Sequence, residues 1–432
     1  MLDIEFIRDN REAVKNAAKN KQINVDVDKL LELDEQRRDL IEKTEKIRQE
    51  RNQHAEKLKA GKPSDEDVAK GKKLKDNLAE LESKLEPVVE SFHDLLKQVP
   101  NIATEDTPVG ATENENQTVY EWGTKPDFEF KPRNHWEIAE ARGWIDKERA
   151  AKVAGARFAY IKGPLVKLQL AIMQFTINTL TDEQTLKEIL KEAKLELPSK
   201  SFTAVLPPYM IREDVFDAMD RLEPREDRYK IEGEDLWLQG SAEHVMGSMY
   251  MDEIIDEKDL PIRFIGYASS FRREAGNYGK DMEGIIRLHQ FDKLEMETLS
   301  TPETGLDEHM LTIAIQEHLM RQLELPYRKL LKCTADIGKP NARGVDLDAW
   351  LPGQGQYKET HTADFMTDYQ TRRLKTRVRR EDGSIDYAHT IDATAFAVGR
   401  AMVAIIENNQ TEDMKVVIPA VLRPLMGGTH VI

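Results

Sequence analysis

The chain has 432 residues, 33% of them charged, and its formal net charge of −16 at pH 7 argues against a protein that binds nucleic acid through its overall charge. The length suffices for two or three domains, and no apolar run approaches the ~20 residues of a membrane-spanning helix. The single cysteine, Cys333, excludes an intrachain disulfide and a cysteine metal cluster. We therefore expect a reducing, cytoplasmic setting, consistent with a start, MLDIEFIRDN, that lacks a secretion-signal pattern.

Two helices of roughly 30 residues are predicted near the N-terminus by residues spaced alternately three and four apart, which keeps one seam facing a partner helix. The two seams comprise Leu30, Leu33, Arg37, Leu40, Thr44, Ile47, Arg51, His54 and Leu58, then Gly71, Leu74, Leu78, Leu81, Leu85, Val88, Phe92, Leu95 and Val99. Between them, AGKPSDED supplies a helix stop, a turn and a new N-cap. We expect an antiparallel hairpin with helices about 45 Å long, the second kinked at Pro87.

Lysines gather around the turn of this hairpin, and acidic residues are interspersed among them. The lysines are Lys57, Lys59, Lys62, Lys70, Lys72, Lys73 and Lys75. One interpretation is a solvated coiled-coil surface with charge pairs four residues apart. The other is an arm that touches an RNA backbone through a local basic patch.

The segment ATENENQTVYEWG is polar and aperiodic, so a domain boundary is expected at about 105–117. Further on, PLVKLQLAIMQFTINTLT is an amphipathic helix, and FTAVLPPYM is a strand that Pro207 and Pro208 end. The motif Ser241-Ala242-Glu243 follows, in which Ser241 could simply be a helix N-cap.

Residues 265–297 predict a β-hairpin. The runs 265–274 and 285–297 are rich in β-branched and aromatic residues, and the glycines of GNYGKDMEG between them favour a turn. Because side chains alternate along a strand, we expect one face to carry Arg272, Glu274, Arg287, His289, Phe291, Lys293 and Glu295. Buried charge is costly unless it is paired, and guanidinium groups suit phosphate or carboxylate. A solvated hairpin with surface ion pairs is the simpler alternative, which Phe291 on the polar face disfavours.

The last third of the chain contains DLDAWLPGQ, then ETHTAD, then ATAFAVGRAMVAIIENNQ. The last of these predicts a strand followed by a helix that carries Arg400. His361 and Asp364 suggest a metal site only weakly, because no third ligand has the usual spacing. No Gly-x-Gly-x-x-Gly or GxxxxGK[ST] loop occurs, which excludes a Rossmann or P-loop nucleotide site.

Together these segments resemble the seryl-tRNA synthetases, in their bacterial form, which are class II aminoacyl-tRNA synthetases. The run FRREAG, a glycine-bounded loop and RLHQFDKLE resemble motif 2 of that class. The helix and proline-ended strand of residues 164–208 resemble motif 1, a dimer interface, and ATAFAVGRAMV resembles motif 3. The opening LDIEFIRDNREAVK is also similar to the start of that family, and the resemblance extends to Gly428.

The resemblance implies an α+β fold, in which an N-terminal antiparallel helical hairpin precedes a class II catalytic domain. That domain would have a mixed, mostly antiparallel sheet flanked by helices. We expect residues 1–110 to form the tRNA-binding arm and residues 111–432 the catalytic domain. The implied activity is serine–tRNA ligation through a seryl-adenylate, with ATP, serine and Mg²⁺ but no zinc, in a homodimer. The family would also allow selenocysteine tRNA as a second substrate.

Site residues follow from the same resemblance. The catalytic residues would be Arg272, Glu359 and Arg400. Serine would be bound by Ser241, Ala242, Glu243, Arg272, Glu295, Asp392 and Thr394. ATP would be bound by Arg272, Arg273, Glu274, Leu288, Phe291, Glu359, Thr360, His361, Thr362 and Arg400. Glu359 and Thr362 would hold Mg²⁺, and the seven lysines of the turn would bind tRNA.

Four segments depart from the family pattern. The stretch 181–201 is longer than usual for the family, and the segment REDVFDAMDRLEPREDRYKIEG differs from the usual family sequence. Thr362 replaces a magnesium-holding serine, and Asp392 replaces an amide beside the substrate ammonium. Asp392 is expected either to bind the same amino group or to alter which substrate fits. Two alternatives therefore stand beside the ligase: a paralogue that activates an amino acid for a carrier protein, and a non-catalytic RNA-binding regulator.

Overall fold

The computed structural model describes residues 1–58, 64–274 and 284–432. The chain forms two compact units, Met1–Ile102 and Ala103–Ile432. Among the described residues no helix combines the length and the apolar character that crossing a membrane requires.

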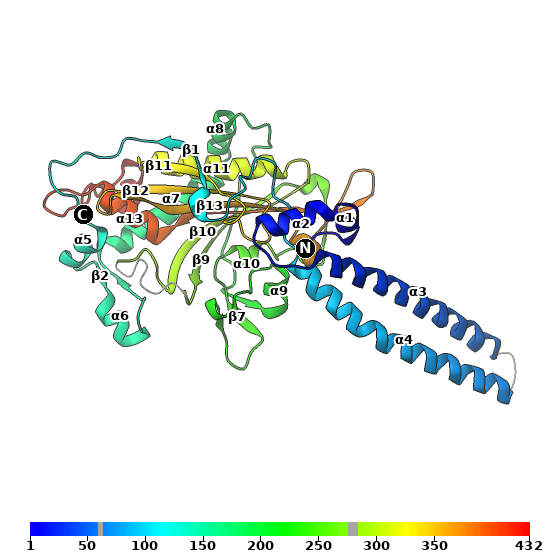
Figure 1. The fold of residues 1–432 in the computed structure, drawn as a ribbon. Helices are drawn as coiled ribbons and strands as arrows, with labels where there is room; N and C mark the ends of the chain where they lie inside the picture. The colour runs from blue at the N-terminus through cyan, green and yellow to red at the C-terminus, as the bar shows by residue number, and fades with distance from the viewer. Residues whose placement is uncertain (59–63, 275–283) are drawn as a thin grey trace. The chain divides into compact units, whose positions relative to one another are not determined.

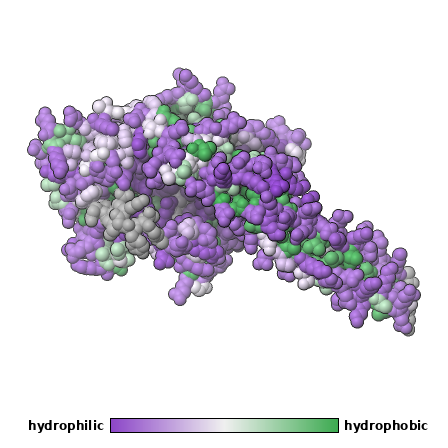
Figure 2. Space-filling model, in the orientation of Figure 1, coloured by the Kyte–Doolittle hydropathy of each residue, from purple (hydrophilic) through white to green (hydrophobic). Residues whose placement is uncertain are grey.

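The N-terminal unit is helical (Figure 1). Its helices are α1 (Ile4–Asp9), α2 (Arg11–Asn20), α3 (Val27–Leu58) and α4 (Asp65–Gln98). Helices α3 and α4 lie side by side as an antiparallel pair, which confirms the predicted hairpin. Every predicted seam residue except Arg51 is buried or partly buried, and Figure 2 shows apolar residues along this pair between hydrophilic ones.

Hydrogen bonds at the start of α4 and along the seam stabilise this helix pair. Ser64 and Asp67 form a capping box that starts α4, as the AGKPSDED segment predicts. Two polar seam residues also form hydrogen bonds: Thr44 Oγ1 donates to the Leu40 carbonyl oxygen at 2.7 Å, and His54 Nε2 lies 2.9 Å from the Asp67 carbonyl oxygen. Pro87 lies inside α4.

The second unit is built on an eight-stranded sheet. Its spatial order is β1 (Gln117–Trp122), β11 (Tyr327–Leu331), β12 (Arg343–Leu351), β13 (Gln356–Thr367), β16 (His389–Ala397), β10 (Gln290–Ser300), β9 (Ile262–Phe271) and β4 (Thr203–Val205). Neighbouring strands are antiparallel except β4 and β9, which are parallel. The mixed, mostly antiparallel sheet predicted from the sequence is thus confirmed.

One face of this sheet is covered by helices that share an apolar core with it. They are α7 (Pro164–Thr181), α8 (Glu183–Ala193), α11 (Gly305–Gln322) and α13 (Val398–Asn408). Side chains alternate along β10, so Leu294 and Met296 belong to this core. Lys293, Glu295 and Glu297 therefore point to the opposite face, where they are also buried.

Shorter elements surround the sheet. The helices are α5 (His135–Ala141), α6 (Lys147–Ala154), α9 (Glu213–Ala218), α10 (Glu243–Met246) and α12 (Thr371–Leu374). The strands are β2 (Ile145–Asp146), β3 (Tyr160–Ile161), β5 (Met210–Arg212), β6 (Tyr229–Lys230), β7 (Leu236–Leu238), β8 (Ile254–Asp256), β14 (Arg377–Arg379) and β15 (Ile385–Tyr387). Single 3₁₀ turns are η1 (Glu113–Glu115), η2 (Arg225–Asp227), η3 (Glu257–Asp259), η4 (Ala420–Leu422) and η5 (Pro424–Met426).

The predicted strand bounds of the central hairpin are wrong at both inner ends, because β9 stops at Phe271 and β10 starts at Gln290. Backbone groups there leave the ladder for other segments. The Arg273 amide donates to the Asp227 carbonyl oxygen, and the His289 amide to that of Arg157, each at 3.0 Å. Glu274 adopts a left-handed φ of 52°, which is incompatible with an extended strand.

Candidate active site

The polar face of the sheet holds two adjoining cavities. The first cavity is lined by Arg272, Glu274, Ile285, Ile286, Arg287, Leu288, Phe291, Lys293, Glu359, Thr360, Thr362, Thr394, Ala397, Gly399 and Arg400. The second, of about 340 Å³, is lined by Arg221, Asp227, Arg228, Glu243, His244, Arg272, Glu274, Arg287, Lys293, Thr362, Asp364 and Asp392. Five side chains line both cavities, which therefore meet there: Arg272, Glu274, Arg287, Lys293 and Thr362.

Arginines and one aromatic ring define the first cavity. Arg272 donates from Nε to the Gly240 carbonyl oxygen at 2.9 Å, and its guanidinium lies 5.5 Å from the centre of the Phe291 ring. Arg400, at the start of α13, donates to a carboxylate oxygen of Glu359 at 2.9 Å. Arg287 forms an ion pair with Glu274. The cavity thus offers fork-shaped cations for phosphate or carboxylate groups and a flat ring for stacking.

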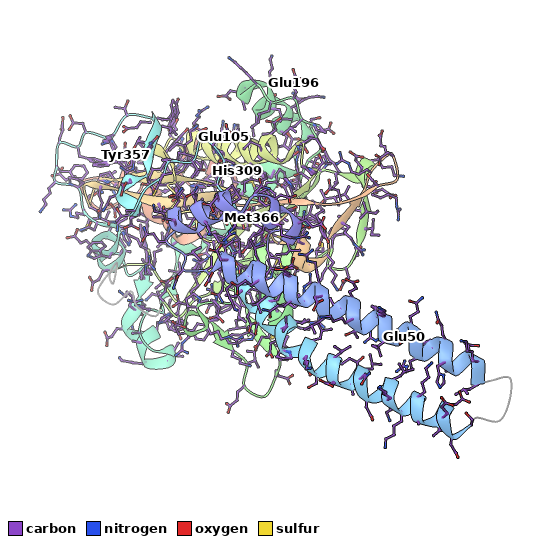
Figure 3. All side chains as sticks on the ribbon, turned by 45° about the vertical axis from the view of Figure 1, so that its right-hand side comes forward. Glu50, Glu105, Glu196, His309, Tyr357 and Met366 are labelled. Carbon is purple, nitrogen blue, oxygen red and sulfur yellow. The ribbon has the colours of Figure 1, made fainter. Side chains whose placement is uncertain are left out.

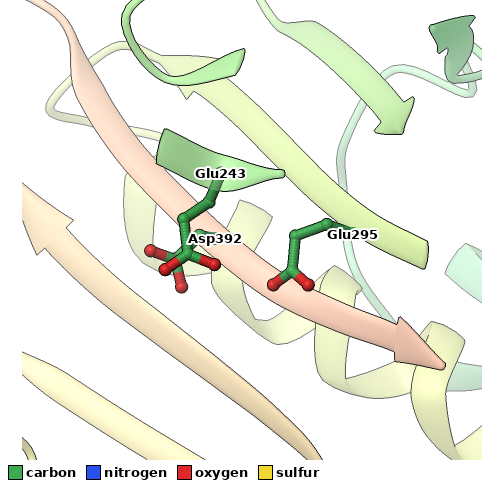
Figure 4. Close-up of side chains that lie close together, drawn as sticks. All are labelled: Glu243, Glu295 and Asp392. Atoms are coloured by element: carbon green, nitrogen blue, oxygen red, sulfur yellow. The ribbon is translucent and has the colours of Figure 1, made fainter. Parts of the chain in front are cut away.

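Three buried carboxylates meet beside the second cavity (Figure 4). Glu243 comes from α10, Glu295 from β10 and Asp392 from β16, and one oxygen of each lies within 4.8 Å of the others. In the β10–β16 pair, Glu297 lies opposite Asp392 and Glu295 opposite Thr394. Sheet register therefore places acidic groups from neighbouring strands together.

Two cations pair with these carboxylates. Lys293 Nζ lies 2.6 Å from a Glu295 oxygen and donates to Ser241 Oγ at 3.0 Å. Arg221 donates to Asp392 at 3.0 Å. Burying a charge without a partner costs several kcal/mol, so Lys293 and Arg221 allow the acidic cluster to exist in the fold.

The three carboxyl groups differ in pKa because their surroundings differ. Burial raises the pKa of Glu295 to about 8, with Lys293 opposing that rise. Burial likewise raises the pKa of Asp392 to about 7, helped by the Glu243 carboxylate and opposed by Arg221. Burial also disfavours the charged form of Glu243, but Lys293, His244 and Arg221 hold its pKa well below the ordinary value. Of the three groups, Glu243 therefore ionises most readily, and its negative charge would attract the ammonium group of a ligand.

Most site residues predicted from the sequence come together around these cavities. The first cavity includes Arg272, Glu274, Leu288, Phe291, Glu359, Thr360, Thr362, Thr394 and Arg400. Glu243 and Asp392 line the second, and Ser241 and Glu295 contact Lys293 at its wall. The N-cap interpretation of Ser241 is wrong, because α10 begins at Glu243 and Ala242 occupies the N-cap.

Besides Ser241 and Glu295, three predicted residues do not line either cavity. Arg273 is exposed and lies 5.9 Å from the Tyr229 ring centre. Ala242 packs in a small apolar cluster with Met246. His361 is fully buried, with its ring against Phe396. Its strand parity differs from that of Asp364, so these two side chains point to opposite faces of β13, which does not favour a shared metal.

Sequence reasoning did not select Lys293, Arg287, Arg228 or Arg221 as site residues. Lys293 could have been found, because it alternates with Phe291 and Glu295 on one strand. Arg221 could not: it lies in a loop after α9 within the segment that departs from the family pattern, and no local spacing marks it.

The comparisons with known proteins agree with this geometry. Residues 1–103 match the family described as "Seryl-tRNA synthetase N-terminal domain", and residues 227–409 match "tRNA synthetase class II core domain (G, H, P, S and T)". The chain is 37% identical to a serine–tRNA ligase of Nitrosopumilus maritimus, over 99% of each chain. It is 38% identical to that of Pyrococcus horikoshii, over 100% of this chain and 98% of the relative.

Solved structures give the same result. The seryl-tRNA synthetase of Pyrococcus horikoshii complexed with ATP matches with a TM-score of 0.87 and 37% identity, over 100% of this chain and 99% of that one. The cytoplasmic serine–tRNA ligase of Naegleria fowleri in complex with AMP matches with a TM-score of 0.84 and 26% identity, over 100% and 98%. The narrower resemblance to the bacterial form stays a prediction.

A buried dyad supports one edge of the first cavity. The Glu407 carboxylate accepts from the ring Nδ1 of His135 at 2.9 Å and from the Gly353 amide at 3.0 Å. His135 Nε2 in turn lies 3.4 Å from the amide nitrogen of Ile285, which lines the cavity. Gly284 fits here because its φ is +65° and a Cβ would lie 1.8 Å from His135 Nε2.

The substitution Gly284→Ala is therefore expected to lower the free energy of unfolding of the second unit by about 2–4 kcal/mol, through backbone strain and the clash with His135. The matched control is Gly338→Ala, whose φ is +73° but whose Cβ would meet nothing within 4 Å. The control should lose only about 1 kcal/mol. Urea denaturation followed by tryptophan fluorescence measures both, because all five tryptophans lie after residue 103. Equal losses in the two variants would contradict the His135 contact.

Proposed function

The chain belongs to the seryl-tRNA synthetases, a family of class II aminoacyl-tRNA synthetases, and we propose that it acts as a serine–tRNA ligase. It activates serine with ATP to seryl-adenylate and pyrophosphate and then transfers serine to the 3′ end of serine tRNA. The observation that carries this proposal is that a cavity with arginines and an aromatic ring meets, at Arg272, a second cavity lined by several carboxylates.

The first cavity suits ATP. Phe291 would stack on adenine, Glu274 would contact the edge of the base, and Arg400 would reach the γ-phosphate. Leu288 and Thr360 would contribute to the walls. Arg272, at the junction of the cavities, would bridge the α-phosphate and the carboxylate of the amino acid. A fork-shaped guanidinium can bond two such anionic groups at once.

The activation step asks the protein for positioning and charge neutralisation rather than covalent chemistry. A carboxylate oxygen of serine forms a bond to the α-phosphorus, and the bond from that phosphorus to the bridging oxygen breaks. Pyrophosphate leaves with the electron pair. Arg272 would lower the repulsion between the attacking carboxylate and the phosphate, and Arg400 would hold the leaving end.

Glu359 and Thr362 would hold Mg²⁺. Both line the first cavity, and a carboxylate with a hydroxyl oxygen matches the oxygen ligands that this ion prefers. The ion would supply additional neutralisation of phosphate charge. Glu359 also pairs with Arg400, so the same carboxylate would orient that arginine.

The second cavity suits serine. Glu243, which lines this cavity, would face the ammonium. Glu295, together with Thr394 from the wall of the first cavity, would bind the side-chain hydroxyl. These two residues lie directly opposite each other in the β10–β16 pair. A pocket that hydrogen-bonds a hydroxyl leaves buried groups unpaired when the hydroxyl is absent, which can give about 10⁴-fold selectivity.

The N-terminal arm would bind tRNA. Lys57, Lys70, Lys72, Lys73 and Lys75 are exposed, whereas Lys59 and Lys62 lie outside the described residues. Contacts to the RNA backbone would select the tRNA by shape. We assign residues 1–110 to this arm and 111–432 to catalysis, with serine tRNA as substrate, selenocysteine tRNA as a second substrate, and the cytoplasm as the site of action.

We also propose a homodimer formed through α7 and the strand after it. Large apolar side chains are exposed there: Leu206 (80%), Leu170 (56%), Met210 (46%), Tyr209 (41%) and Val166 (41%). Large apolar side chains exposed in this way favour a protein partner. The carrier-protein and regulator alternatives are less favoured, because the long arm and Arg272, Glu295, Glu359 and Arg400 are all present.

Pyrophosphate exchange with ATP should depend on serine and give little signal with threonine, alanine or glycine. Glu295→Gln keeps the shape of the side chain but replaces one carboxyl oxygen with an amide nitrogen that cannot accept a hydrogen bond, so it should lower kcat/KM for serine by at least about 100-fold. The control is Glu196→Gln, a change at an exposed position on the outside of the unit (Figure 3) that should leave exchange unchanged. The assignment of serine as the substrate would be refuted by exchange that depends on another amino acid. The assignment of Glu295 would be refuted if the Glu295→Gln variant showed undiminished exchange with serine.

The arm is tested by changing Lys70, Lys72, Lys73 and Lys75 together to glutamine. We expect the KM for serine tRNA to rise about 10-fold and its salt dependence to weaken, because fewer phosphates are contacted. Serine-dependent exchange should not change. The control alters four exposed lysines of the second unit, Lys131, Lys187, Lys191 and Lys258. An equal effect on tRNA charging in both variants would argue against a specific role for the arm.

A further inference from the structure

Arg221 enters the wall of the second cavity from the loop after α9, and its side chain is only 17% exposed. Its Nη2 donates to Asp392 Oδ2 at 3.0 Å and lies 3.5 Å from the sulfur of Met366. Its Nε lies 3.5 Å from Glu243 Oε1. One guanidinium therefore spans carboxylates from two elements, α10 and β16.

The loop that carries Arg221 is itself fixed. The carboxylate of Asp220 pairs with Lys339 at 2.7 Å and with Arg373 at 3.0 Å. The Met219 carbonyl oxygen accepts from Gln370 Nε2 at 3.0 Å, and that of Arg221 accepts from Arg228 Nε at 3.0 Å. Several independent contacts thus set the position of the guanidinium before any ligand arrives, which is what a preorganised site requires.

The charges around Arg221 explain why a cation is needed at this point. Asp392 is 2% exposed and Glu243 is 8% exposed. Asp364 lies opposite Asp392 in the β13–β16 pair, and Glu297 lies opposite it in the β10–β16 pair. Lys293 is already held 2.6 Å from Glu295. Without Arg221, Asp392 would be a buried carboxylate among other carboxyl groups.

Glu243 is held less tightly than Asp392. Its oxygens lie 3.5 Å from Arg221 Nε and 3.8 Å from Lys293 Nζ, which are distances of ion pairs rather than of good hydrogen bonds. Glu243 is therefore oriented by two cations and still able to accept hydrogen bonds from a ligand. Asp392, by contrast, already accepts a hydrogen bond from Arg221.

We propose that Arg221 is a positioning residue for the amino-acid substrate, because it occupies Asp392 and aligns Glu243 so that the substrate ammonium binds Glu243. This inference rests on the proposed activation of serine. Asp392 then serves as the anchor of Arg221 and not as the partner of the ammonium. The two residues form one unit, so the loss of either should disturb serine binding, and the loss of both charges should disturb it less.

Four variants of the full chain are compared in serine-dependent pyrophosphate exchange: Arg221→Met, Arg221→Lys, Asp392→Asn and the double variant Arg221→Met with Asp392→Asn. Arg221→Met leaves Asp392 unpaired to compete for the ammonium, and Asp392→Asn frees Arg221 to occupy Glu243. Each of these two single changes, Arg221→Met and Asp392→Asn, should raise the KM for serine by at least about 10-fold while the KM for ATP changes less than about twofold. The double variant should recover to within about threefold of the wild-type KM.

Arg343→Met is the matched control, since Arg343 is a buried arginine paired with Asp106 at 2.8 Å and lies in neither cavity. It should leave both KM values unchanged. Arg221→Lys keeps the positive charge and should keep the fold, but its ammonium is a single donor group, so we expect an intermediate serine KM. This variant tests the inference even if Arg221→Met does not fold. Three outcomes would overturn the inference. The first is a wild-type serine KM in both Arg221→Lys and Asp392→Asn, and the second is an equal rise in the KM values for serine and ATP. The third is a serine KM in the double variant that combines the effects of the two single changes. Absence of serine-dependent exchange in the wild-type chain would refute the proposed function instead.

Discussion

The alternation of side chains along β10 is the constraint on which the site depends. Leu294 and Met296 join the apolar core under the helices, which commits Lys293, Glu295 and Glu297 to the opposite face. Those charges are buried, and buried charges must find partners. Lys293 pairs with Glu295, whereas burial and the neighbouring carboxylates hold the pKa of Glu297 well above its ordinary value, which favours its neutral form. The acidic cluster is therefore a consequence of sheet geometry, and its electrostatic balance is what a cationic ammonium group can exploit.

The same geometry joins the two halves of the reaction. Arg272 follows the last residue of β9, where the backbone leaves the ladder, and its guanidinium lies at the junction of both cavities. The first cavity has arginines, an aromatic ring and threonine hydroxyls, and the second has carboxylates interspersed with arginines. A nucleotide phosphate and an amino-acid carboxylate would thus meet at the same cation, so that binding the two substrates already neutralises the charge that opposes their reaction.

Much of this could be predicted from the sequence, because it rests on local patterns. The spacing of Leu30 to Leu58 gave the arm, Ser64 and Asp67 gave its second helix start, and alternation placed Phe291 and Glu295 on one face. The inner ends of the hairpin were mispredicted because the amides of Arg273 and His289 bond to distant segments. Arg221 was missed because its role depends on a loop fixed by Arg373 and Lys339, which no local pattern encodes.

The most direct test of this account is a crystal structure of the chain with a non-hydrolysable seryl-adenylate analogue. We predict that the adenine stacks on Phe291, that Arg272 contacts the group replacing the α-phosphate, and that the serine ammonium lies on Glu243 while Arg221 still pairs with Asp392. An analogue bound away from the two cavities, or an ammonium paired with Asp392 after displacement of Arg221, would contradict it.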